Sequence, residues 1–246
     1  MKPLMCRLQV INGKLEFDSV TPLALTLDQQ IQEDKKYGVM TPANQKYFTY
    51  QAMDWKNDII NSKEIQNAVR NSWQAIERRL DFKVQRAAPG EIIDFKVYFR
   101  STIDDPDLTS NTLMYHFYPI NDINSEFRGV CVVNTDFPFS VDGKSVDMHY
   151  IDPGHYPNVG SGLLGGTYDF DQIYGRHEVC HGLGLPHSTH SGTTMYFSYG
   201  GMVEYFDDED PQETFPRLVA KYGEKSTWEK FKIRWIQWER VRYDNY

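Results

Sequence analysis

Apolar and polar positions in the first half of the chain follow the two periods that separate strands from helices. Residues 93–99, IDFKVYF, alternate strictly, which predicts a strand with one buried face. Four shorter runs are further strand candidates: residues 48–51, 82–84, 113–118 and 129–133. Residues 63–80 instead follow Ser62, a helix-capping residue type, and repeat apolar side chains at helical spacing. The repeating positions are Ile65, Val69, Trp73, Ile76 and Leu80.

The residues before this region show a different pattern. Residues 10–15, VINGKL, place an Asn-Gly pair between short apolar runs, which predicts a β-hairpin. The polar residues 28–36, with the glycine and proline that follow, are typical of a linker. We therefore expect an N-terminal extension over residues 1–43, with a role in latency or interaction, and a main domain over residues 44–246.

The second half of the chain predicts a loop and two helices. Residues 153–166 are rich in glycine and proline and read as an ordered loop, which a helix follows directly. Residues 226–229, STWE, form a capping box that opens a C-terminal helix through about residue 242. The order of strands, helix, strands, helix and helix predicts an α+β fold with a mixed sheet.

Composition and charge narrow the class of protein. The 246 residues are 40% hydrophobic and 14% aromatic, enough for the core of one large domain or a domain with an extension. The net charge of −8, without a run of Lys or Arg, argues against nucleic acid as a partner. We expect no membrane span and no signal peptide in the chain as given, because no apolar stretch is long enough. Three widely spaced cysteines, Cys6, Cys131 and Cys180, predict free thiols.

One segment, residues 177–187 with the sequence HEVCHGLGLPH, predicts metal chemistry. Histidines at positions i and i+4 share one helix face, so His177 and His181 can bind the same zinc ion. Glu178 lies about 100° around the helix, within reach of a water at the metal without being a ligand. The alternative is that these are ordinary helix histidines, but the spacing of the whole segment favours zinc.

A third ligand requires the chain to turn back after this helix. Gly184 allows that turn, because glycine accepts the positive φ that ends a helix sharply. His187 then falls where the third ligand belongs. Three neutral imidazoles with an open fourth position are typical of a catalytic zinc site with a single ion, and Glu178 is the expected general base and acid.

The extended zinc motif resembles that of the metzincin zinc endopeptidases, and most closely that of the matrixins, the matrix metalloproteinase family. Residues 193–196, TTMY, are similar to the turn that places a methionine, here Met195, beneath the metal. Residues 195–199, MYFSY, resemble the matrixin Met-Tyr-Pro-x-Tyr, although Phe197 replaces the proline. The resemblance implies that Tyr199 lines the pocket for the substrate side chain after the scissile bond.

The resemblance extends more weakly over residues 47–199 and implies further properties. The fold would be a zincin-like domain with a twisted mixed sheet, a long first helix, an active-site helix and a C-terminal helix. The strand that ends in Pro119 would be the sheet edge to which an extended peptide substrate adds. The family is mostly secreted, so the resemblance implies an extracellular protein. The oligomeric state stays open.

The remaining candidate ligands have plainer interpretations. Cys6 lies outside any matrixin switch sequence, so we expect a structural cysteine in a strand rather than an inhibitory metal ligand. We expect Cys180 to be a packed thiol and His190 to be an exposed loop residue. The acidic groups are candidates for calcium, although solvated loops are the commoner case. These groups are Asp104, Asp105 and Asp107, and the run from Asp207 to Asp210.

The leading hypothesis is a zinc-dependent endopeptidase that acts on protein or peptide substrates. The alternative is a catalytically silent metallopeptidase fold that serves as a binding or structural module. Glu178 argues against this alternative, because a silent module has no need for a carboxylate beside the metal. A zinc hydrolase of non-peptide amides has the same ligands, and the family resemblance argues against it.

Overall fold

The computed structural model describes much of the chain, in segments. These are residues 4–11, 14–17, 25–53, 62–137, 139–140, 147–148, 168–169, 173–188, 190, 193–195, 198–199 and 213–226. Its strands are β1 (Met5–Ile11), β2 (Lys14–Phe17), β3 (Phe48–Met53), β4 (Val84–Arg86), β5 (Phe95–Arg100), β6 (Thr112–Phe117), β7 (Val130–Asn134), β8 (Phe139–Ser140), β9 (Asp147–Met148), β10 (Tyr168–Asp169) and β11 (Ser198–Tyr199). Its helices are α1 (Leu27–Asp34), the 3-10 turn η1 (Lys35–Tyr37), α2 (Ser62–Glu77), the π-helical η3 (Ile173–Glu178), α4 (Val179–Gly182) and α5 (Thr214–Tyr222).

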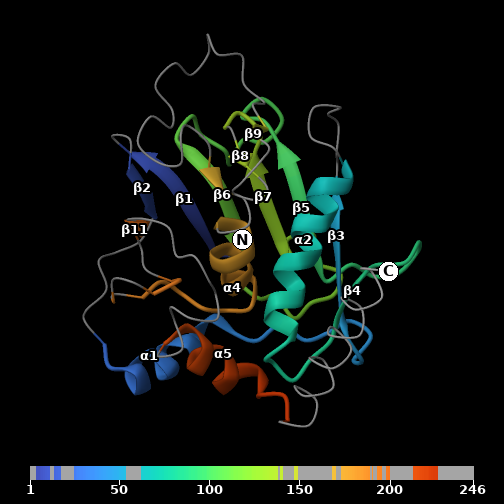
Figure 1. The fold of residues 1–246 in the computed structure, drawn as a ribbon, viewed down its shortest axis with the longest axis vertical. Coiled ribbons are helices and arrows are strands. Elements are labelled where there is room, and N and C mark those ends of the chain that lie inside the picture. The colour runs from blue at the N-terminus through green and yellow to red at the C-terminus, as the bar shows by residue number, and fades with distance from the viewer. Residues whose placement is uncertain are drawn as a thin grey trace, which may run out of the picture.

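The main sheet of the described residues is mixed and runs in the order β11-β2-β1-β6-β7-β5-β3-β4 (Figure 1). β4, β3, β5 and β7 are parallel, and β6, β1, β2 and β11 continue the sheet through antiparallel pairs. β5 alternates between buried and half-buried residues, as predicted, whereas every residue of β7 is buried. Both strands lie in the interior of the sheet, between β6 and β3.

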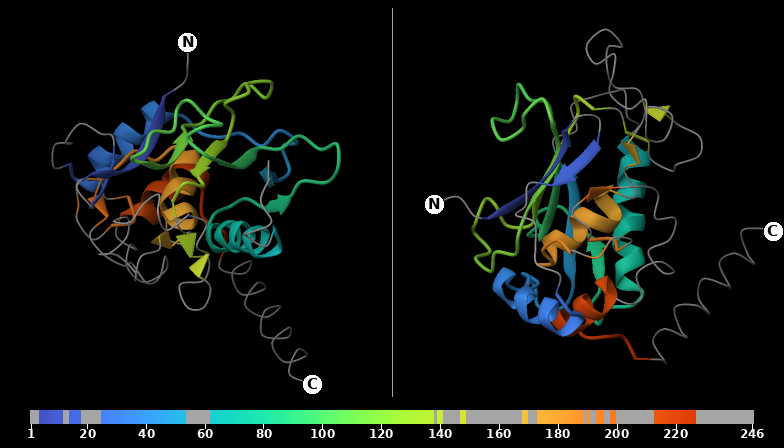
Figure 2. Two further views of the ribbon diagram at one scale, coloured as in Figure 1. Left: turned by 90° about the horizontal axis from the view of Figure 1, so that it is seen from above. Right: turned by 90° about the vertical axis from the view of Figure 1, so that its left-hand side faces the viewer.

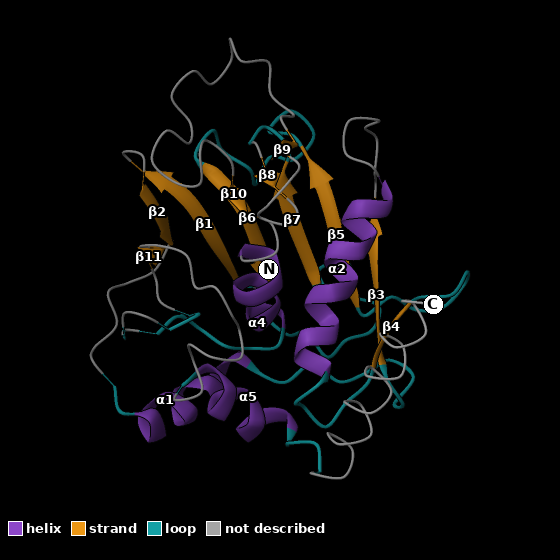
Figure 3. Ribbon diagram, in the orientation of Figure 1, coloured by secondary structure: helices purple, strands orange, loops and turns teal. Residues whose placement is uncertain are grey.

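The helices divide into two groups around this sheet. α2 and α4 lie on one face of the sheet, as the view from above shows (Figure 2), and η3 contacts α2. The main core fills the space between them and includes Val69, Trp73 and Leu80 of the predicted helix. α1 and α5 lie side by side at one end of the sheet (Figure 3). The layers of strands and helices agree with the expected α+β class.

The predicted hairpin is present, but its place in the molecule was not anticipated. β1 pairs with β2 through Ile11 and Lys14, on either side of the Asn-Gly pair. The other edge of β1 pairs with β6, with Cys6 opposite His116. The N-terminal extension therefore contributes two strands to the main sheet.

Two described segments differ from the predictions. The expected linker at residues 28–36 is a helix, because Thr26 and Gln29 form a capping box at the start of α1. α5 was not predicted, although Phe215, Leu218 and Tyr222 repeat at helical spacing.

The expected loop at 153–166 lies outside the described residues, as does nearly all of the expected C-terminal helix. No helix in the described part of the chain is both long and apolar enough to cross a bilayer.

Candidate metal centre

The segment that carries the zinc motif is one helix with two geometries. Residues 173–178 are π-helical, and residues 179–182 continue as the α-helix α4. Such wide turns occur within helices at functional sites. The chain then turns at Gly184, whose φ is +88°, as predicted for a glycine that ends the helix. This turn returns the backbone so that His187 faces the helix.

The ring nitrogens of His177 and His187 both lie close to that of His181. His181 Nε2 lies 2.9 Å from His177 Nε2 and 3.2 Å from His187 Nε2. Tetrahedral zinc with Zn–N bonds of about 2.0–2.1 Å places its ligand nitrogens about 3.3 Å apart. The two distances from His181 are therefore close to those between ligands of a shared zinc ion.

In His177 and His181, the hydrogen bond from Nδ1 determines that Nε2 faces the centre. His177 Nδ1 donates to the Thr194 carbonyl at 2.7 Å, and His181 Nδ1 donates to the Leu185 carbonyl at 2.6 Å. A neutral imidazole that donates from Nδ1 carries its lone pair on Nε2. The Nε2 atoms of these two rings therefore present lone pairs toward each other, an arrangement that a cation between them stabilises.

Burial keeps these rings neutral. It lowers the pKa of His177 to about 4 and the pKa of His181 and His187 well below the ordinary value. Neighbouring imidazoles lower the pKa of His181 and His187 further. Neutral imidazole is the form that binds a metal ion, so the chemistry of the three donors fits zinc.

Glu178 follows His177 in the same helix and is shielded from solvent. It is fully buried, and neither carboxyl oxygen has a hydrogen-bond partner among the described residues. Burial raises the pKa of this carboxyl well above its ordinary value. A buried carboxyl without a partner is costly, and a cation with a bound water would supply what is missing. Glu178 thus also fits a zinc site.

The turn with the methionine packs against the histidines. Met195 is fully buried, and its carbonyl accepts a 2.6 Å hydrogen bond from the Ser188 amide. The Thr194 carbonyl before it holds His177 in place. Tyr199, the expected pocket residue, lies in β11, whose backbone pairs with β2.

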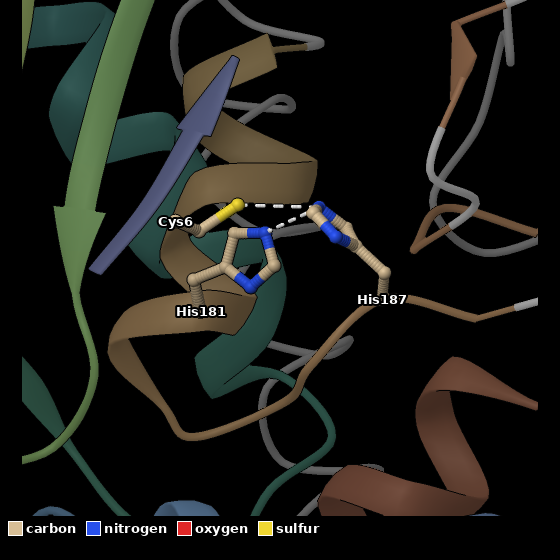
Figure 4. A group of neighbouring side chains, drawn as sticks. All are labelled: Cys6, His181 and His187. Carbon is tan, nitrogen blue, oxygen red and sulfur yellow. Dashed lines mark hydrogen bonds between the residues drawn. The ribbon is translucent and has the colours of Figure 1, made fainter. Parts of the chain in front are cut away.

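Cys6 is the residue at this centre that sequence reasoning interpreted differently. It is a buried strand residue, as expected, but its Sγ lies 3.2 Å from His187 Nε2 (Figure 4). Cys6 Sγ and one ring nitrogen each of His181 and His187 all lie within 4.8 Å of one another. The sequence around Cys6 carries no switch motif, so only its place in β1 brings the thiol to the histidines.

β6 is not the free edge that the sequence predicted for substrate binding. β1 pairs along it from Met5 to Gln9, and β2 continues the sheet to β11. The hairpin therefore fills the place between β6 and the strand after the methionine turn.

The calcium candidates that the structure describes already form hydrogen bonds or ion pairs with other residues of the protein. Asp105 accepts hydrogen bonds from the Tyr115 hydroxyl and the Asp107 amide and pairs with Arg100. Asp104 accepts a hydrogen bond from Ser101. These contacts explain the carboxylates without an ion, so the structure gives no support for calcium. The second acidic run, residues 207–210, lies outside the described residues.

Two other candidates have the environments that the sequence predicted. Cys180 is fully buried in the core. The side chain of His190 is 48% exposed and contacts Glu213 rather than the histidine cluster. Neither residue is part of the centre.

A mixed sheet, a helix with the paired histidines, a glycine turn to a third histidine and a methionine turn together define the metzincin class of metalloproteins. The family model of the matrixins, peptidase M10, matches residues 42–212. The chain belongs to the matrixin family, whose members are zinc-dependent metallopeptidases. The search of curated protein sequences gives no match.

Proposed function

We propose that this matrixin is a zinc-dependent endopeptidase in which His177, His181 and His187 hold one zinc ion. The observation that carries the proposal is the convergence of three buried imidazole nitrogens next to a buried carboxyl that has no partner among the described residues. Met195 supports the site as a packed residue in the turn beneath it. This donor set leaves a fourth position for catalysis.

Glu178 does the proton chemistry in this proposal. When bound, zinc acts as a Lewis acid that polarises the peptide carbonyl and lowers the pKa of a water to about 7. Glu178 would take a proton from the water while the water oxygen attacks the peptide carbonyl carbon. The same carboxyl then gives the proton to the nitrogen of the leaving amine, which releases the two peptide products. The burial of Glu178 strengthens its interaction with the reacting groups.

The substrate is an extended segment of protein that adds to β6 as a strand. β6 ends close to the histidine centre. Tyr118 directly follows β6, and its ring lies against the ring of His181. A peptide on β6 would also face β11, which holds Tyr199. Main-chain hydrogen bonds to a strand give affinity, and side-chain pockets give specificity.

The β1–β2 hairpin occupies this same strand position, so we propose that it keeps the enzyme latent. Its Cys6 sulfur lies beside the fourth position of the histidine centre. A thiolate is a good zinc ligand and would exclude the water that Glu178 needs. This assigns latency to the strands of the N-terminal extension.

The first test compares zinc content and cleavage of unfolded casein for the wild type and Glu178→Ala, each as the full chain and without residues 1–17. We expect about one zinc ion in every form. Without the hairpin, Glu178→Ala should be slower than the wild type by a factor of at least about 100. A chelator should abolish cleavage.

Three results would change this interpretation. Zinc binding without cleavage in any form would favour the silent binding module. Equal cleavage by the wild type and Glu178→Ala would exclude Glu178 as the base. A wild type that binds no zinc would overturn the proposal as a whole.

A further inference from the structure

A buried ion pair joins α1 to α5 beneath the third histidine. Arg217 in α5 donates from Nε and Nη2 to the two carboxylate oxygens of Asp34 in α1, each at 2.8 Å. Both side chains are at most 1% exposed. Arg217 Nη1 also donates to Glu213 at 3.1 Å. Figures 1 and 2 show that the two helices lie side by side.

The same two helices hold the backbone of the third histidine. Arg217 Nη2 donates to the Pro186 carbonyl at 2.7 Å, and Gln30 Nε2 of α1 donates to the His187 carbonyl at 3.3 Å. These two carbonyls belong to the turn after Gly184, outside any helix or strand. Side chains from outside the zinc motif therefore fix two successive peptide units at His187.

A structural role alone explains this ion pair poorly. A buried ion pair costs much of its Coulomb energy in desolvation and is often no more stable than an apolar replacement. Its planar, two-pronged geometry does fix the direction of the guanidinium. Asp34 holds Arg217 in the orientation in which Nη2 reaches Pro186.

We propose that Asp34 and Gln30 of α1 are positioning residues for the zinc site. This inference rests on zinc binding at the three histidines, as proposed above. α1 and α5 both lie outside residues 42–212, which the matrixin family model matches. The N-terminal extension thus has two parts with opposite effects. Its hairpin blocks the centre, and its helix supports it.

The test measures zinc affinity of the full chain by competition with a chromophoric chelator, for the wild type and Asp34→Asn. The matched control is Asp94→Asn. Asp94 forms another fully buried aspartate–arginine pair, 2.8 Å from Arg128, and its carboxylate accepts hydrogen bonds from the Thr49 and Ala43 amides rather than from the histidine turn. Loss of a group that orients a ligand lowers metal affinity about 10- to 100-fold. We expect that loss for Asp34→Asn and unchanged zinc affinity for Asp94→Asn.

A spectroscopic readout separates positioning from general loss of stability. With cobalt in place of zinc, the visible absorption bands should change for Asp34→Asn and stay as in the wild type for Asp94→Asn. Gln30→Leu removes the hydrogen bond to the His187 carbonyl and keeps the ion pair. Gln30→Leu should also lower zinc affinity. It therefore tests the positioning role even if Asp34→Asn does not fold.

Equal effects of Asp34→Asn and Asp94→Asn on zinc affinity would overturn the positioning role, as would wild-type affinity in both α1 variants. Zinc binding without peptide cleavage, in the wild type both with and without residues 1–17, would overturn the proposed hydrolysis and leave this inference intact. A wild type that binds no zinc would overturn both.

Discussion

Two ligands of the proposed centre, His177 and His181, are oriented by hydrogen bonds to backbone carbonyls. Carbonyls of Thr194 and Leu185 orient His177 and His181 through Nδ1. His187 is oriented by the turn that Gly184 permits. The sequence motif identifies the three rings, but backbone hydrogen bonds determine which nitrogen of His177 and His181 faces the proposed metal position.

Gly184→Ala tests the turn at the residue scale. Alanine at a φ of +88° costs about 1–2 kcal/mol, and its Cβ would lie 2.6 Å from the Gly38 carbonyl oxygen. Relief of that overlap costs about 1–3 kcal/mol more and shifts His187. Urea unfolding should therefore show a loss of about 2–5 kcal/mol, and zinc affinity should fall.

Gly90→Ala is the control for this substitution. Gly90 has a similar φ of +81°, and nothing lies within 4 Å of an added Cβ. We expect a loss of about 1–2 kcal/mol from the backbone conformation alone, with unchanged zinc affinity. Equal losses in the two variants would show that the contact with Gly38 has no energetic role.

At the scale of elements, the structure divides the N-terminal extension differently from the sequence. β1 and β2 add to the sheet, whereas α1 packs under the centre and is joined to α5 by Asp34, Arg217 and Lys221. The sequence predicted a hairpin and a linker. The capping box at Thr26 was present in the sequence and identifies the start of the helix, but the low apolar content of 28–36 concealed it.

Two truncations test this division. Removal of residues 1–17 takes away the hairpin and should raise casein cleavage, because β6 and the fourth metal position become free. Removal of residues 1–37 also takes away α1 and should lower zinc affinity about 10- to 100-fold relative to the shorter truncation.

Cys6→Ser in the full chain separates the thiol from the strand. It should raise cleavage less than removal of residues 1–17 does, because β1 still covers β6. If the full-length wild type cleaves casein as fast as the chain without residues 1–17, the proposed latency is contradicted.

At the scale of the whole molecule, buried histidines link the fold to pH. His116 of β6 is fully buried beneath α4, and burial lowers its pKa to about 4. The unfolded chain gains this proton near pH 6.5, and the folded protein gains it only near pH 4. The unfolded state therefore binds more protons between these values, and stability falls as the pH falls through them.

His116→Asn should reduce this acid sensitivity. Between pH 7 and pH 4.5, the shift in the pKa of His116 contributes about 2 kcal/mol to the loss of unfolding free energy. Urea unfolding of the metal-free protein at both pH values measures the loss, since a chelator removes the effect of zinc release. The loss should be about 2 kcal/mol smaller in His116→Asn. An equal loss in both proteins would show that His116 is not buried in its neutral form.

The sequence by itself determined the features that depend on neighbouring residues. Helical spacing at 177–181, the glycine at 184 and the alternation at 93–99 each indicate local geometry, because a few backbone bonds fix the relative positions of these side chains. The strands β3, β5, β6 and β7 and the helix α2 were predicted on the same grounds.

Only the tertiary structure decided which distant residues meet at the centre. The thiol of Cys6 reaches His187 across 181 residues, and Arg217 reaches Asp34 across 183 residues. No local pattern encodes such contacts, because they depend on the pairing of β1 with β6 and the packing of α1 on α5. The sequence thus specified the zinc motif, while the fold decided that Cys6, Gln30 and Arg217 contact it.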